Sequence, residues 1–217
     1  MSPCLQKLAT PERVLAYSGF NVRQKVLLMC CLLHSIHDGF TSAMYVVLPL
    51  ISTDLRLAYA QVGLLKTLIS GGESLLQLPG GLLAERVGER RMLALGLAVL
   101  SGAFLLLAPS GLFAAVGTLC LLIGTGASMQ HPLSSSLVSQ VYETSGRRTA
   151  MGTYNFAGDV GKVAFPELLS GLILIFGWSA SVEALGVFGL AAALLVWVGE
   201  TRRRARGVRR LMAHHRP

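Results

Sequence analysis

The sequence has few charged residues. Asp, Glu, Lys and Arg make up 14% of its 217 residues, whereas a soluble domain usually contains about 25%. Charged residues are missing from long continuous stretches, and 53% of the chain is hydrophobic. This combination argues against a soluble domain and predicts a bundle of membrane-spanning helices.

Cysteine is scarce as well. Cys4, Cys30, Cys31 and Cys120 have no spacing typical of a disulfide framework or a metal site, so we expect them to behave as small hydrophobic side chains. We expect no cofactor. Residues 1–25 contain five charged side chains and lack the apolar core and small-residue cleavage site of a signal peptide. They are predicted to form a basic cytoplasmic segment.

Six apolar segments follow, and each is close to the roughly 20 residues that a helix needs to cross a bilayer. They are residues 26–51, 60–84, 92–109, 112–139, 149–176 and 180–198. The sequence therefore predicts an all-α membrane protein. Residues 26–199 would form a domain of six transmembrane helices, and residues 200–217 an arginine-rich cytoplasmic tail.

The basic residues lie on one side of this predicted bundle. Sixteen of the 19 Lys and Arg residues fall in the N-terminal segment (four), the connections after the second and fourth spans (three and two) and the C-terminal tail (seven). The opposite side has only Arg56, and Lys66 and Lys162 lie inside spans. Short segments rich in Lys and Arg stay in the cytoplasm. We therefore expect cytoplasmic termini and a bacterial-type inner (plasma) membrane, with the lipid bilayer and not nucleic acid as the partner.

The segment 80–91, GGLLAERVGERR, separates the second and third spans. It contains five charged residues, Glu85, Arg86, Glu89, Arg90 and Arg91, around Gly88. Because so many charges are costly in hydrocarbon, we expect this segment to be a loop in water.

Polar side chains form stripes at helical spacing on four of the six predicted helices. The stripes are His34, His37, Asp38, Thr41 and Tyr45 on the first; Lys66, Ser70, Glu73 and Gln77 on the second; Ser128, His131 and Ser135 on the fourth; and Asn155, Asp159 and Lys162 on the fifth. The third and sixth helices have no such stripe. We expect the four striped helices to surround a polar cavity and the other two to face lipid or pack outside.

Ionisable side chains inside spans are functional candidates. We interpret Asp38, Glu73, His34 and His37 as proton-coupling residues, because a carboxylate beside imidazole in a low-dielectric environment can exchange protons near neutral pH. The alternative is a purely structural hydrogen-bonded cluster. The residues expected to line a substrate cavity are Tyr45, Lys66, Gln77, Ser128, His131, Asn155, Asp159 and Lys162. Asp159 and Lys162, three residues apart, can instead form an ion pair that only holds the fold.

The charged segment resembles the signature segment between helices two and three of the major facilitator superfamily. The matching residues are Gly81, Glu85, Arg86, Gly88, Arg90 and Arg91, with Glu85 in place of the usual Asp. The repeat of striped helices resembles one major-facilitator half, a 3+3 inverted repeat. Three further features resemble fosmidomycin-resistance-like efflux proteins: His34 with Asp38, the stretch from Gly124 to His131–Pro132, and the region from Gly158 to Gly161.

This resemblance implies a proton-coupled secondary transporter that exports a small polar or amphiphilic compound by alternating access, and not an enzyme. The segment 80–91 would act as a cytoplasmic gating loop. The resemblance covers residues 25–200, which is six of the usual twelve helices. A single half would leave its polar stripes open to lipid, so we expect a parallel homodimer with the site on the two-fold axis.

Two other hypotheses remain open. The chain could be a fragment, or a subunit that needs a different six-helix partner. It could also be an intramembrane metal-dependent enzyme that uses His34, His37 and Asp38, for which His131 would have to supply a further ligand.

Overall fold

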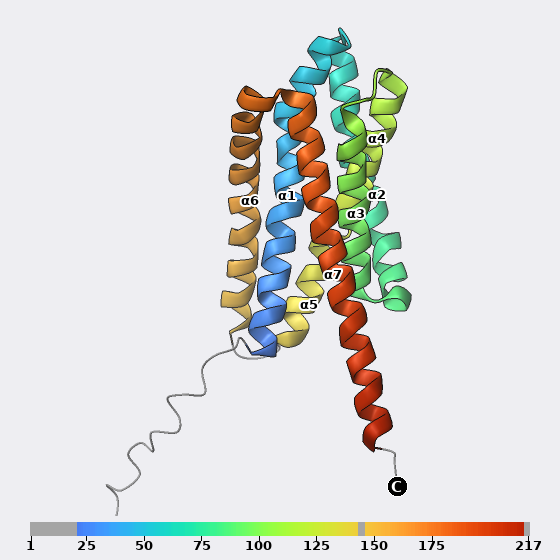
Figure 1. The fold of residues 1–217 in the computed structure, drawn as a ribbon, viewed down its shortest axis with the longest axis vertical. Helices are drawn as coiled ribbons and strands as arrows, with labels where there is room; N and C mark the ends of the chain where they lie inside the picture. Colours follow the sequence, from blue (N-terminus) through green and yellow to red (C-terminus); the bar gives the residue numbers. More distant parts are fainter. Residues whose placement is uncertain (1–20, 143–145, 215–217) are drawn as a thin grey trace, which may run out of the picture.

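The computed structural model describes residues 21–142 and 146–214, which form an elongated bundle of seven α-helices (Figure 1). Side chains are described through residue 203. The helices are α1 (Val22–Asp54), α2 (Tyr59–Val87), α3 (Glu89–Leu107), α4 (Phe113–Ala127), α5 (Gln130–Val141), α6 (Arg147–Phe176) and α7 (Trp178–His214).

The predicted spans correspond to these helices, with the fourth span divided into α4 and α5. In the described part of the chain, four segments are long and apolar enough to cross a membrane: Val22–Asp54, Glu89–Leu107, Phe113–Val141 and Trp178–Arg203. Helices α2 and α6, with 29 and 30 residues, are also long enough. They carry the polar stripes with Lys66 and Glu73 and with Asp159 and Lys162, which lower their apolar character.

Helix pairs build the bundle. Helix α1 packs along α6, α3 packs along α7, and α4 packs against α2 and α3. Helix α3 is largely buried between α7 and α4. Two apolar cores stabilise the bundle, one around Phe40 and Phe104 and the other around Leu93 and Leu97.

Glycines allow the closest helix contacts. A Cβ atom on Gly161 of α6 would overlap the backbone of Ser35 of α1, and a Cβ atom on Gly124 of α4 would overlap the carbonyl oxygen of Ile69 of α2. Small residues at such positions let membrane helices approach backbone to backbone. The α1–α6 and α2–α4 pairs therefore depend on these two glycines.

The fourth predicted span is broken at Ser128 and Met129, which form a turn between α4 and α5. Pro132 lies in the first turn of α5, where its missing N–H group costs no helical hydrogen bond. The fourth predicted span is therefore divided into two helices at this turn.

The prediction that residues 80–91 form a loop is wrong. Helix α2 continues to Val87 and α3 begins at Glu89, so Gly88 is the one non-helical residue between them. Its φ of 101° and ψ of 134° favour glycine. The charged side chains belong to helix ends, where Arg86 in the last turn of α2 and Glu89 in the first turn of α3 have favourable signs for the helix dipole.

The basic segments that the structure describes lie at the same end of the bundle. The start of α1, the junction of α2 with α3, the start of α6 and the C-terminal part of α7 are at the lower end of the bundle in Figure 1. Residues 1–20 of the predicted basic segment and residues 143–145 lie outside the described residues. Helix α7 continues through the predicted boundary at residue 200 to His214. Cys30, Cys31 and Cys120 are buried as expected, and Cys4 lies outside the described residues.

Candidate functional site

A buried carboxylate, that of Asp38, lies where α1, α5 and α6 meet, with 4% of the residue exposed. His34 Nε2 is 3.2 Å from Asp38 Oδ2, and Lys162 Nζ is 3.3 Å from the same oxygen. His131 Nε2 is 3.5 Å from Asp38 Oδ1. With Asp159, these residues form what we call the central cluster.

His34 is held in place by α6. Its Nδ1 is 2.9 Å from the carbonyl oxygen of Tyr154, and because a carbonyl only accepts, Nδ1 donates this hydrogen bond. The His34 ring also stacks on the Tyr154 ring, with centroids 4.1 Å apart. Gly158 leaves the room for this arrangement, since a Cβ atom there would overlap both His34 and Asp38. Nε2 of His34 is therefore aimed at Asp38.

Lys162 connects two carboxylates. Its Nζ is 3.0 Å from Asp159 Oδ1 in addition to its contact with Asp38. The side chains of Lys162 and Asp159 are 50% and 69% exposed, whereas that of Asp38 is 6% exposed. The expected Asp159–Lys162 pair is present, and it extends to the buried carboxylate of α1. The central cluster thus has an enclosed side and an open side.

Two of the four predicted proton-coupling residues are not joined to the cluster by hydrogen bonds or ion pairs. Nδ1 of His37 hydrogen-bonds to Leu33 O within α1, and the His37 side chain is buried. Glu73 of α2 is half-buried and has no ion pair or hydrogen bond with any described residue. Helical spacing correctly grouped His34 with Asp38 but could not reveal that Lys162 and His131, rather than Glu73, reach them.

The other predicted cavity residues lie at different places. Lys66 Nζ is 4.6 Å from the ring centroid of Tyr45, which makes a cation–π contact between α2 and α1. Ser128 is buried in the turn after α4 and donates to Thr125 O, so it lines no cavity in the described part of this structure. Asn155 is exposed on α6, one turn before Asp159.

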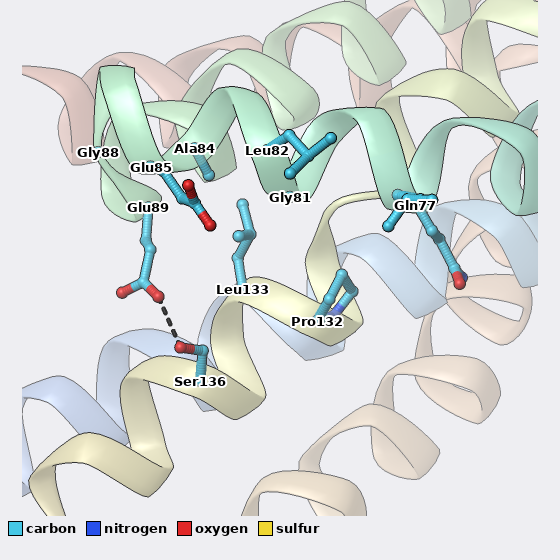
Figure 2. Close-up of a pocket in the computed structure, with 11 residues that line it drawn as sticks. Gln77, Gly81, Leu82, Ala84, Glu85, Gly88, Glu89, Pro132, Leu133 and Ser136 are labelled. Carbon is cyan, nitrogen blue, oxygen red and sulfur yellow. Dashed lines mark hydrogen bonds between the residues drawn. The ribbon is translucent and has the colours of Figure 1, made fainter.

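A pocket of about 670 Å³ lies between α2, the start of α3 and α5 (Figure 2). Gln77, predicted to line the cavity, is found here together with Glu85 and Glu89. Ser136 Oγ donates to Glu89 at 2.6 Å, and Gln140 Nε2 donates to the same carboxylate at 3.2 Å. Glu89 thereby connects α3 to α5.

The signature segment also contacts α7. Arg90 is 3.7 Å from Glu200, and the Arg91 guanidinium lies over the Trp197 ring at 5.6 Å. Glu85 and Arg86 are exposed. The segment therefore holds three helices together at the basic end, in agreement with a role at that end and not in the middle of the bundle.

The geometry of the cluster bears on the metal hypothesis. Ligand atoms of His34, Asp38 and His131 all lie within 4.8 Å of one another, whereas His37 is not part of this group. Lys162 Nζ lies 3.3 Å from Asp38 Oδ2, and a positive charge so close opposes binding of a metal cation. The possible ligand set is therefore His34, Asp38 and His131, without the predicted His37. The charge of Lys162 argues against a metal ion at this set.

A multi-pass helical bundle with charged residues enclosed among its helices is the arrangement of a secondary transporter. The chain belongs to the Major Facilitator Superfamily, whose family model matches residues 30–217. The resemblance expected from the signature segment is confirmed.

Known relatives agree with this assignment. A "Probable L-galactonate transporter" of Escherichia coli is 29% identical over 147 residues, which is 66% of this chain and 32% of that protein. The "Fosmidomycin resistance protein" of Escherichia coli is 26% identical over 163 residues, 73% of this chain and 40% of that protein. A "Probable galactarate/D-glucarate transporter" of Bacillus subtilis is 26% identical over 184 residues, 82% of this chain and 40% of that protein. The matched regions thus cover only 32–40% of the length of these curated relatives.

Proposed function

We propose that the chain is a half-size secondary transporter that works as a parallel homodimer and couples efflux of a small polar compound to protons by alternating access. The observation that carries this proposal is the central cluster, in which a buried carboxylate contacts two histidines and a lysine. Both termini would be cytoplasmic, in a bacterial-type inner membrane, because the basic residues gather at one end.

The coupling step follows from the charges in the cluster. Lys162 contacts the buried Asp38 on one side and the exposed Asp159 on the other, and half of its own side chain is exposed. When Asp38 is protonated, Lys162 loses that partner and its ammonium group can bind an anion that enters from the open side. When Asp38 releases its proton, the carboxylate competes for Lys162 and the anion leaves. The proton and the anion are therefore carried together, and efflux by this step follows an outward gradient of the anion. His34 and His131 provide the neighbouring proton acceptors.

The names of the relatives suggest the substrate class. Two of the relatives described above are named for L-galactonate or for galactarate and D-glucarate, which are hydroxylated carboxylates. The exposed edge of the cluster presents Lys162 and His131, both suited to a carboxylate. We therefore propose a small hydroxylated carboxylate as substrate. The proposed outward direction follows the relative named for fosmidomycin resistance.

Lys162→Ala is expected to weaken binding of galactarate about tenfold or more, since a charge-assisted hydrogen bond contributes about 1.5–3 kcal/mol. Calorimetric titration of the purified protein in nanodiscs measures this. Lys66→Ala is the matched control, because Lys66 contacts Tyr45 and not the cluster. An unchanged affinity in Lys162→Ala would make Lys162 a structural partner of Asp38 and Asp159 only.

The homodimer is proposed because one side of the bundle is left uncovered. Asp159 and Lys162 are exposed there on α6, and charged side chains facing lipid are costly. A second six-helix unit would cover them. The two halves of major-facilitator transporters are related by an axis along the membrane normal, which a second copy in the same orientation reproduces.

Two chains are expected in each particle when the purified protein is weighed in nanodiscs and the lipid and scaffold are subtracted. A tagged and an untagged copy should also purify together. A mass of one chain, with no co-purification, would contradict the homodimer. It would support the alternative, in which the chain is a fragment or a subunit that pairs with a different six-helix unit.

A further inference from the structure

A groove of about 440 Å³ runs between α1 and α6 on the outside of the bundle. Leu28 and Leu32 line it from α1, and Phe156 and Val160 line it from α6. All four of these side chains are exposed. Ser35 lies at one end of the groove, where its hydroxyl already donates to the carbonyl of Ala157. The groove is therefore apolar along its length.

The groove faces away from the central cluster. Phe156 and Val160 each follow a residue of the polar stripe, Asn155 and Asp159, by one position. One position corresponds to a rotation of about 100° around a helix. The groove therefore does not open into the polar side of the bundle, and lipid chains can reach it.

The length of the groove matches one leaflet. Its α1 wall extends from Gln24 to Ser35, and eleven residues of helix rise about 16 Å. Half of a hydrocarbon core of about 30 Å is about 15 Å. A groove of this length accommodates most of one acyl chain that starts at the membrane surface.

The surface end of the groove is basic. Arg23 and Lys25 flank the lining residue Gln24, and Arg147 and Arg148 begin α6 on the other wall. All four basic residues are exposed. Residues 21–37 of α1 and 147–158 of α6 contain no Asp or Glu. The charge at this end therefore complements an anionic headgroup and does not favour a neutral or cationic one.

We propose that the α1–α6 groove binds an anionic phospholipid of the leaflet on the basic side of the membrane. One acyl chain lies along Leu28, Leu32, Phe156 and Val160, and the phosphate lies at the basic end of the groove, near the start of α1. This site is separate from the central cluster and does not depend on the proposed transport activity.

Native mass spectrometry of the full chain in detergent tests the site, with dioleoylphosphatidylglycerol and dioleoylphosphatidylcholine as probes. The unaltered protein should retain phosphatidylglycerol more strongly. Arg23→Gln/Lys25→Gln should weaken phosphatidylglycerol binding about tenfold and bring it to the phosphatidylcholine level. Arg202→Gln/Arg203→Gln is the matched control, because it removes the same charge from α7 at the same end, away from the groove. It should leave binding unchanged.

Filling the groove tests the acyl-chain part. Two single variants, Leu32→Trp on one wall and Val160→Trp on the other, should each weaken binding of both lipids. Thermal unfolding of each variant in the same detergent checks that it is folded. Equal losses of phosphatidylglycerol binding in Arg23→Gln/Lys25→Gln and in Arg202→Gln/Arg203→Gln would overturn the proposal, because they would indicate a general attraction of the lipid to positive charge. Normal lipid binding in folded Leu32→Trp and Val160→Trp would overturn it as well. Disulfide-linked dimers of Leu32→Cys would assign the groove to a second copy of the chain instead.

Discussion

Asp38→Asn is expected to abolish flux driven by a pH gradient while the bundle stays folded. The amide keeps the volume of the carboxyl group but cannot carry its charge, so Lys162, His34 and His131 lose their common counterion. Loss of about 3 kcal/mol of charge-assisted contacts corresponds to a decrease of about 100-fold in a rate or equilibrium. Uptake of labelled substrate into proteoliposomes under an imposed pH gradient measures the effect.

The control for this prediction is Asp54→Asn at the far end of the same helix. Asp54 accepts a hydrogen bond from Trp178 Nε1 and lies about 24 Å along α1 from Asp38, at about 1.5 Å per residue. Its replacement should leave pH-driven flux in place. Substrate exchange at equal pH should survive in Asp38→Asn if this residue acts only in coupling. Normal pH-driven flux in folded Asp38→Asn would reduce the central cluster to a structural role.

Gly161→Leu is expected to separate α1 from α6 and to destabilise the bundle by about 3 kcal/mol or more, as overpacking against backbone does. The new Cβ atom would overlap the backbone of Ser35, which cannot move without displacing α1. The central cluster depends on the same contact, because His34 and Asp38 on α1 meet Tyr154 and Lys162 on α6. Thermal unfolding in detergent should therefore occur at a clearly lower temperature.

Gly152→Leu and Gly171→Leu serve as matched controls on the same helix. A Cβ atom at either position meets nothing within 4 Å, so these variants should unfold close to the temperature of the unaltered protein. If Gly161→Leu unfolds at the same temperature as the two controls, α1 and α6 do not make the close contact described.

The sequence alone was sufficient for the features that depend on one helix at a time. The apolar segments follow from hydropathy. The basic residues on one side follow from counting. Each polar stripe follows from the helical period, and the contact of His34 with Asp38 is a consequence of that period.

Contacts between helices could not be predicted in the same way. The period fixes which residues share a face but not which other helix that face meets, so Glu73 was grouped with Asp38 and Lys162 was not. A hydroxyl such as that of Ser128 can also bond to a backbone carbonyl three residues earlier. The segment 80–91 shows a different limit. Its charges favoured a loop, but a single glycine with positive φ suffices to turn the chain.

The break between α4 and α5 also places a helix beginning inside the bundle. Helix α5 starts at Gln130, about midway along the 29-residue segment Phe113–Val141, and His131 in its first turn faces Asp38. The beginning of a helix carries a partial positive charge of about half an elementary charge. That charge comes from backbone amides and cannot be titrated away. It therefore offsets part of the negative charge of Asp38 at every pH, even when the neighbouring histidines are neutral.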